Sequence, residues 1–211
     1  MERGECSEDA EDDMNTEKRP YLPVEERRAL LLDAAFEVVA TDGAGALSLR
    51  AVAERAGVAH RVVSYAFGAK TELIAALLRR ESARTMSQVW SAPLLGLSLQ
   101  DAVAAALDAL LADLRSNTAR HRVVADLSAS ARSSDLTIDA ARAEASDDLA
   151  AIAARLREWQ DATSQPLPAP APVVAAAVLA AANGLVDQWL ALPDEPTAAA
   201  TARLLSRAFT N

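Results

Sequence analysis

The sequence from Leu47 to Lys70 reads LSLRAVAERAGVAHRVVSYAFGAK and has the spacing of two short helices joined by a tight turn. Close approach of two helices requires a small residue at their contact, and Ala53 provides it. Gly57 follows four positions later and tolerates the positive φ that a tight turn requires. Val63, six positions beyond Gly57, supplies an apolar side chain that anchors the second helix. This spacing predicts a helix-turn-helix, a motif whose second helix enters the major groove of DNA.

Further helices are predicted on both sides of this motif. Pro23 is a good first-turn residue for a preceding helix, which Gly43 ends, and Ser48 is a suitable N-cap for the first helix of the motif. Three more apolar side chains complete the small core, namely Val52, Val58 and Phe67. Downstream, amphipathic patterns predict helices over about 70–90, 99–115, 118–132, 136–162, 173–191 and 196–209.

Composition favours a purely helical fold. Hydrophobic residues make up 51% of the 211 residues and aromatic residues only 4%, so much of the apolar content is Ala, Leu and Val. Ala and Leu are strong helix formers, and seven Gly are too few for a turn-rich all-β domain. The fold class is therefore predicted to be all-α, with a helix-turn-helix domain over 20–70 and a helical body over 71–211. Residues 1–19 are polar and acidic, and we expect them to be disordered.

The formal net charge of −9 is unevenly distributed along the chain. Residues 1–19 and residues 86–211 each carry a net charge of −5, whereas residues 20–85 carry +1. Phosphate binding depends on the local placement of Lys and Arg rather than on the total charge. The acidic total therefore does not argue against DNA as a partner of the block that contains the motif.

Several other classes of protein are disfavoured. Cys6 has no partner for a disulfide and two histidines are too few for most zinc sites, so we expect no metal and no cofactor. The sequence contains no G-x-S-x-G, Walker or H-E-x-x-H motif, and we expect it not to be an enzyme. No stretch of about 20 apolar residues lacks charge, and the acidic amino-terminal segment is unlike a signal peptide. We therefore expect a cytoplasmic protein with no membrane partner.

The block from about Arg27 to Leu78 resembles the DNA-binding domain of the TetR/AcrR family of transcriptional regulators. That family has a long helix ending in a Gly-containing turn, here AAFEVVATDG over 34–43, and a second helix led by Ser or Thr, here SLRAVA over 48–53. An Ala-Gly-Val turn over 56–58, a short recognition helix and the closure FGAK over 67–70 follow, with Leu73 beyond. The resemblance implies a ligand-responsive regulator that binds a pseudo-palindromic operator as a dimer. Repression is the expected mode and activation the alternative.

The resemblance also implies which side chains contact double-stranded DNA. In the groove we expect His60, Arg61, Val62, Ser64 and Tyr65, and near phosphates Ser48, Arg50 and Lys70. Lys70 begins a helix, so its charge adds to free backbone N–H groups directed at the same anion. Arg61 is expected either to read guanine or to bind a phosphate, and His60 to contact DNA or be solvated rather than to bind metal. The sequence departs from the family pattern at Ala59, where a phosphate-contacting hydroxyl is usual, and at Arg61, Ser64 and Ala66.

In this family the body holds an effector pocket and a two-fold dimer interface. Candidates for contact with an unidentified small-molecule effector are Met86, Trp90, His121, Trp159 and Trp189, with filling of the core as the alternative. Candidates for the homodimer interface are Val178, Leu179, Ala182, Val186, Leu204 and Leu205, with an intramolecular core as the alternative. One helix-turn-helix reads only a half-site, which also favours a dimer. An enzyme is the rival class, and a third interpretation is a ligand-independent architectural DNA binder or interaction protein, against which an enclosed cavity in the body would argue.

Overall fold

The computed structural model describes residues 23–89 and 96–210, and among these residues it contains helices and no strands. The α-helices are α1 (Val24–Asp42), α2 (Leu49–Ala56), α3 (His60–Phe67), α4 (Lys70–Val89), α5 (Leu99–Ser116), α6 (Thr118–Arg132), α7 (Ile138–Thr163), α8 (Ala171–Ala191) and α9 (Glu195–Ser206). Two 3-10 turns, η1 (Ala44–Ala46) and η2 (Arg207–Phe209), follow α1 and α9. The predicted all-α fold class is confirmed. The predicted disorder of 1–19 lies outside the described residues.

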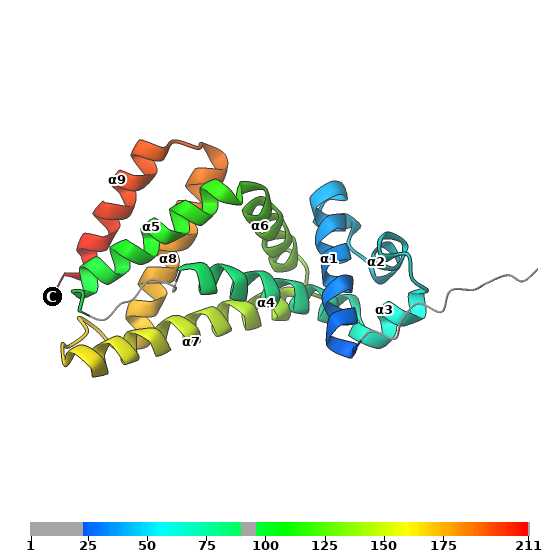
Figure 1. The fold of residues 1–211 in the computed structure, drawn as a ribbon, viewed down its shortest axis with the longest axis horizontal. Helices are drawn as coiled ribbons and strands as arrows, with labels where there is room; N and C mark the ends of the chain where they lie inside the picture. The colour runs from blue at the N-terminus through cyan, green and yellow to red at the C-terminus, as the bar shows by residue number, and fades with distance from the viewer. Residues whose placement is uncertain (1–22, 90–95, 211) are drawn as a thin grey trace, which may run out of the picture.

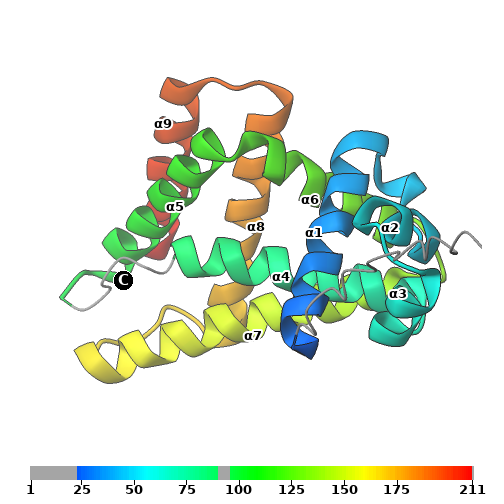
Figure 2. The same ribbon diagram turned by 45° about the vertical axis from the view of Figure 1, so that its right-hand side comes forward.

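The helices form two units joined by α4 (Figure 1). Helices α1, α2 and α3 pack together at one end of the molecule, and α4 runs from them into a larger body. In the body, α8 packs against α7, α5 and α9, and α4 packs against α5 and α7 (Figures 1 and 2). Helix α6 contacts both units, because it lies against α1 and η1 as well as α4, α7 and α8. The fold therefore places α4 and α6 between the smaller unit and the body.

The predicted core of the helix-turn-helix is confirmed. Ala53, Val63 and Phe67 are buried between α1, α2 and α3, together with Val52. Gly57 ends α2 in the left-handed conformation, with φ 63° and ψ 37°, as the tight turn required. The hydroxyl of the N-cap Ser48 accepts a hydrogen bond from the Ala51 backbone N–H at 3.1 Å, so it satisfies one free donor at the start of α2.

Helix α8 stands out by its apolar composition. By length and composition alone it qualifies as a membrane-crossing helix, with a mean hydropathy of 1.5 over its most apolar window, although no such segment was expected from the sequence. Core helices of globular proteins pass the same test, and α8 packs against four other helices, α5, α6, α7 and α9. Only 28% of that window is buried within the protomer, so much of the apolar surface of α8 is left uncovered by its own chain.

Candidate nucleic-acid interface and body cavity

The outward face of α3 carries most of the side chains predicted to enter the DNA groove. His60 and Arg61 are exposed in the first turn, and Tyr65 is 89% exposed one turn later. The Ser64 hydroxyl is half-buried and hydrogen-bonded to Nδ1 of His60 at 3.3 Å. Val62 differs from the rest, because it is half-buried and packs against the core of the small unit. An exposed aromatic ring and an exposed guanidinium on one short helix are suited to contacts outside the protomer.

The side chains predicted to approach phosphates flank α3. Lys70 is exposed at the first position of α4, beside free backbone N–H groups. Arg50 is exposed on α2, where its Nε donates to Oε1 of Glu54 at 2.9 Å. The hydrogen bond and charge of Glu54 raise the pKa of Arg50 above its ordinary value. DNA phosphates would therefore compete with Glu54 for the Arg50 guanidinium.

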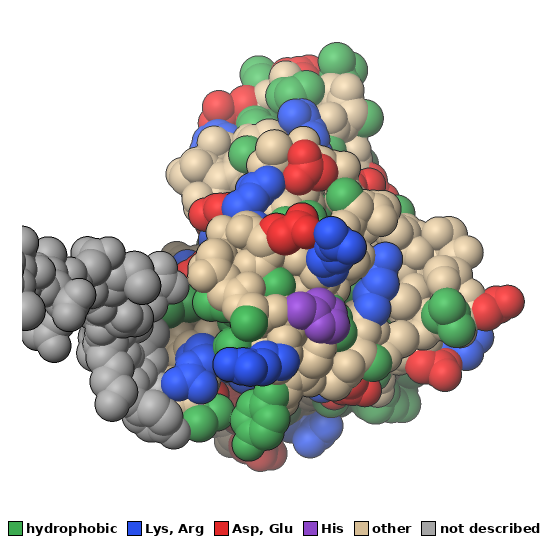
Figure 3. Space-filling view, turned by 90° about the vertical axis from the view of Figure 1, so that its right-hand side faces the viewer, with side chains coloured by type: hydrophobic (Ala, Val, Ile, Leu, Met, Phe, Trp, Pro, Cys, Tyr) green, Lys and Arg blue, Asp and Glu red, His purple; other side chains and the backbone are tan. Residues whose placement is uncertain are grey.

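This end of the molecule presents basic side chains around a histidine (Figure 3). Acidic side chains are also visible, many of them above that histidine in this view and others to its right and below it. A shallow depression lies beside His60, lined by residues of α2 and the turn, namely Arg50, Ala53, Glu54 and Val58. The surface therefore combines exposed donors with a recess next to the first turn of α3.

Two arginines that were not among the predicted site residues link the helices beneath this surface. Arg28 of α1 donates to the carbonyl of Ala66 near the end of α3, and its guanidinium lies 4.5 Å from the centroid of the Phe67 ring. Arg55 of α2 is paired with Asp42 at the end of α1, at 3.1 Å. Both arginines contact residues that are distant in the sequence, so helical periodicity does not predict these contacts. They fix the angles of α2 and α3 against α1.

The body contains a cavity of about 750 Å³ bounded by α4, α5, α6, α7 and α8. Its aliphatic wall includes Met86, Leu107, Leu110, Ile152, Val178 and Leu179. Its charged lining residues are Arg122, Asp126, Arg132, Glu144, Asp148 and Asp187, and His121 also lines it. Apolar walls with a few polar groups are typical of sites for small molecules, and this volume suits a drug-sized ligand.

The predicted pocket residues are divided between the cavity and the core. Met86 and His121 line the cavity. Trp159 is buried in the core, where its Nε1–H donates to the carbonyl of Leu97 at 3.1 Å, and Trp189 is also buried in the core. Neither tryptophan lines the cavity. Trp90 lies outside the described residues.

The residues predicted for a dimer interface also fall on different faces. Val178, Leu179, Ala182 and Val186 of α8 line the cavity of the protomer itself. Leu205 is half-buried against the core of the body, whereas Leu204 of α9 is 64% exposed. The uncovered face of α8 is instead formed by Val173, Ala176, Ala177, Ala180 and Gly184, which we call the outer face of α8. The sequence pattern had not separated these two faces, because both are apolar.

Two carboxylates of α7 have unusual surroundings in the cavity wall. The pKa of Glu144 is raised to about 7, first by burial and then by the charge of Asp148, while the charge of Arg132 lowers it. Burial also raises the pKa of Asp148, against the effect of a hydrogen bond that its carboxylate accepts from the Ser82 hydroxyl of α4. The two carboxylates stand four residues apart on one helix, so they share a face of α7. Near neutral pH Glu144 therefore binds or releases a proton readily.

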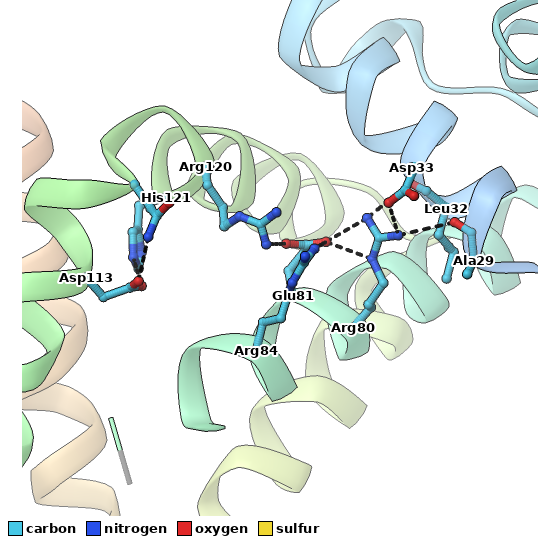
Figure 4. A network of polar contacts seen from close by, with 10 residues as sticks. Ala29, Leu32, Asp33, Arg80, Glu81, Arg84, Asp113, Arg120 and His121 are labelled. Carbon is cyan, nitrogen blue, oxygen red and sulfur yellow. Dashed lines mark hydrogen bonds and ion pairs between the residues drawn. The ribbon is translucent and has the colours of Figure 1, made fainter. Parts of the chain in front are cut away.

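A buried glutamate links α4 to α6 and α1 (Figure 4). The carboxylate of Glu81 is 1% exposed and pairs with Arg80 at 2.8 Å and with Arg120 of α6 at 2.7 Å. Arg80 in turn donates to Asp33 of α1 at 2.7 Å. The guanidinium of Arg120 also lies 5.2 Å from the centroid of the Phe36 ring on α1. One buried charge thus connects three helices at the junction of the two units.

A second contact across the junction involves the cavity wall directly. The carboxylate of Asp126 on α6 accepts a hydrogen bond from the backbone N–H of Ala44 in η1, at 3.0 Å. Asp126 also lines the cavity. One turn earlier on α6, His121 lines the cavity and its Nε2 lies 2.7 Å from the Asp113 carboxylate of α5. Helix α6 therefore forms one wall of the cavity and touches the small unit.

Comparison with known proteins agrees with this geometry. Residues 31–77 match the family model of the bacterial regulatory proteins of the tetR family. They include the buried core of the motif, the turn at Gly57 and the whole of α3. The class is thus a helix-turn-helix regulator with a helical body. Over residues 31–77 the chain therefore carries a DNA-binding domain of the type found in the tetR family of bacterial regulatory proteins.

Solved structures share the fold of the whole chain. GusR of Salmonella enterica has a TM-score of 0.70 and 18% identity, covering 87% of this chain and 95% of its own. A transcriptional regulator from Rhodococcus sp. has a TM-score of 0.66 and 23% identity, covering 86% and 95%. The multidrug binding protein EbrR, in complex with ethidium, has a TM-score of 0.69 and 24% identity, covering 88% and 99%. No protein of curated function matches the chain in sequence.

Proposed function

We propose that this regulator binds a pseudo-palindromic operator as a homodimer in the cytoplasm and represses transcription until a small molecule occupies the cavity of the body. The DNA-binding unit would comprise residues 20–70, and the effector-binding and dimerisation unit residues 71–211. The observation that carries the proposal is the exposed face of α3, with Arg61 and Tyr65 pointing outward and Lys70 following at the start of α4. In a helix-turn-helix this is the face that enters the major groove.

A homodimer would present two helix-turn-helix motifs, one for each half-site of the operator. The outer face of α8 has small side chains, which permit close approach of a second helix, and Val173 and Leu204 add larger exposed apolar groups at 57% and 64% exposure. A two-fold interface uses the same surface on both subunits, so one apolar face on α8 and α9 suffices. We therefore assign the interface to the outer face of α8 and to Leu204, in place of the cavity-lining residues of α8.

The cavity favours the interpretation that the protein is a ligand-responsive regulator over the interpretation that it is an architectural DNA binder. Its wall includes Asp126, which is bonded to η1, and Ser82, which follows Glu81 on α4. A ligand that displaced α4 or α6 would disturb the contacts of Glu81 with Arg80 and Arg120. The spacing of the two recognition helices in the dimer would change, and the population of DNA-competent dimers with it.

Lys70 and Arg61 test the DNA-binding surface. Lys70→Ala should weaken binding to specific and random duplexes about equally, and it should lower the slope of log affinity against log salt by about one unit per half-site, since a phosphate contact releases one counterion. Arg61→Ala should cost roughly 1–3 kcal/mol on the selected operator and relax preference at one base pair in each half-site. Affinities are measured on an operator selected from random duplexes and on random DNA, across several salt concentrations.

Arg142→Ala is the matched control, because Arg142 is an exposed arginine on α7, away from α3. It should leave both affinities unchanged. An Arg61→Ala variant that only flattens the salt dependence would make Arg61 a backbone contact and leave base reading to His60 or Tyr65. Unchanged DNA binding in both Lys70→Ala and Arg61→Ala would contradict the proposed surface.

A further inference from the structure

The cavity has an acidic pole on α7. Glu144 and Asp148 face the same space as Ser82 of α4, and among the described residues neither carboxylate forms an ion pair with a basic side chain. Four carboxylates line the cavity, those of Asp126, Glu144, Asp148 and Asp187, against the two guanidinium groups of Arg122 and Arg132. Asp126 is already engaged with the backbone of η1. The cavity is thus acidic on balance, and its least compensated charge lies on α7.

Glu144 and Asp148 are half-buried and have no ion-pair partner among the described residues, which disfavours their charged forms, and a cationic ligand is one means of compensating them. The charge of Arg132 acts on Glu144 but does not outweigh burial and the neighbouring Asp148. The hydroxyl of Ser128 gives a second sign of a missing partner. Ser128 is 8% exposed in the cavity wall, and within the described part of the chain its side chain makes no hydrogen bond. A polar group of a ligand or a water molecule would satisfy it.

The rest of the wall indicates what kind of cation fits. The apolar lining is aliphatic, and no Phe, Tyr or Trp lines the cavity among the described residues. An inorganic cation would need several converging oxygen or nitrogen ligands, and the described residues hold no group of three or more His, Cys, Asp or Glu side chains suited to a metal ion. A volume of about 750 Å³ is also far larger than a bare ion requires.

We propose that the cavity takes an organic monocation with an aliphatic body, whose charged group lies against Glu144 and Asp148 while its hydrocarbon contacts Met86, Leu107 and Ile152. This inference rests on the proposed function, because it names the class of effector for the same cavity. One positive charge replaces the proton that Glu144 exchanges near neutral pH. Asp148 would then exchange its bond with Ser82 for the ligand, which changes a contact between α4 and α7.

The test uses the full-length protein and isothermal titration calorimetry with three probes of equal chain length. These are octyltrimethylammonium, 1-octanol and octanoate, which differ in charge and share an aliphatic body. We expect the cation to bind at least about tenfold more tightly than either of the others, because only its charge is opposite to that of the carboxylates. Equal or tighter binding of octanol or octanoate, or no binding of any probe, would overturn the proposal.

The pH dependence gives a second readout. Octyltrimethylammonium keeps its charge at every pH, so only protein groups titrate on binding. Glu144 is half protonated near its pKa of about 7, and the cation binds the ionised form, so affinity should rise about tenfold from pH 6 to pH 8. The other titratable groups lining the cavity are His121, Arg122, Asp126 and Arg132 of α6, Asp148 of α7 and Asp187 of α8, while α4 and α5 contribute none.

Glu144→Gln should separate the role of Glu144 from that of its neighbours. The amide keeps the size of the side chain and removes the charge, so affinity for the cation should fall about ten- to hundredfold at pH 8 and lose most of its pH dependence, while octanol binding is unchanged. His121 and Asp148 remain in this variant, so a retained pH dependence would assign the titration to one of them and overturn the role of Glu144. Asp161→Asn is the matched control, because Asp161 is exposed on the same helix and does not line the cavity.

A final arm separates this inference from the proposed function. The same cation is added to the protein bound to its selected operator, and DNA affinity is measured. Tight, Glu144-dependent binding of the cation with no change in DNA affinity would support the ligand class and contradict the ligand-responsive regulation. Release of DNA by octanol or octanoate, with no effect of the cation, would support the regulation and overturn the ligand class.

Discussion

Replacing Glu81 with alanine is expected to lower the free energy of unfolding by about 3 kcal/mol. The carboxylate is buried and holds Arg80 and Arg120, at 2.8 Å and 2.7 Å. Its removal leaves two guanidinium groups close together with their shared anion missing. Both arginine side chains reach solvent in part, at 20% and 26% exposure, so water compensates some of the loss and the lower end of the usual range applies. Urea denaturation followed by circular dichroism measures the effect.

The matched control is Asp108→Ala on α5. Asp108 is an exposed carboxylate in the middle of a helix, with no ion pair in the parts of the chain that the structure describes, so its removal should change stability by less than about 0.5 kcal/mol. A Glu81→Ala variant as stable as the Asp108→Ala control would show that the three-helix junction does not depend on the buried charge. Glu81→Gln should be less damaging than Glu81→Ala, because its carbonyl oxygen still accepts a hydrogen bond.

The helix-turn-helix was predictable because its determinants are local. Ala53, Gly57 and Val63 lie within eleven positions, and each is required by backbone geometry or helix contact rather than by a distant partner. The N-cap role of Ser48 was confirmed for the same reason. Helix boundaries in the body also agreed to within a few residues, since Pro, Gly and helix-capping residues separate the amphipathic segments.

The junction and the cavity were not predictable from local pattern. Arg80 and Asp33 are 47 positions apart, and Glu81 and Arg120 are 39 apart, so no periodicity brings them together. The sequence pattern of α4 does not distinguish Glu81 from the exposed polar residues of that helix. Only the packing of the helices shows that Glu81 is buried. Glu144 is likewise indistinguishable from a surface glutamate until packing places it half-buried in the wall of the cavity.

Helix α8 illustrates a different limit. Its run of Ala, Val and Leu is apolar on nearly every side, so hydrophobic spacing identified a helix but not the direction in which each residue points. Val178 and Ala182 were expected at an interface between subunits, and the structure places both in the wall of the cavity. Ala177 and Ala180 lie instead on the outer face. The contacts of α8 with α5, α7 and α9 determine which of its residues face the cavity and which face outward. Those contacts involve residues distant in the sequence, so the local pattern does not predict them.

The double substitution Ala180→Glu and Leu204→Glu is expected to convert the proposed dimer to a monomer and to lower operator affinity by about a thousandfold or more. Both side chains are exposed in the protomer, so two added carboxylates do not disturb its core. In a two-fold dimer each substitution appears twice, and four charges would be buried in an apolar interface. A monomer reads one half-site, and its affinity should fall toward the non-specific level.

Sedimentation velocity measures the oligomeric state of this variant, and titration of the selected operator measures its DNA affinity. Ala112→Glu on α5 is the control, because Ala112 is exposed on a helix whose other side covers α9, and it should remain dimeric. The single variant Val178→Glu separates the two faces of α8. Because Val178 is buried and lines the cavity, its substitution should lower thermal stability and cavity binding rather than split the dimer directly. An intact dimer in the double variant, together with a monomeric and stably folded Val178→Glu protein, would place the interface on the face that here encloses the cavity.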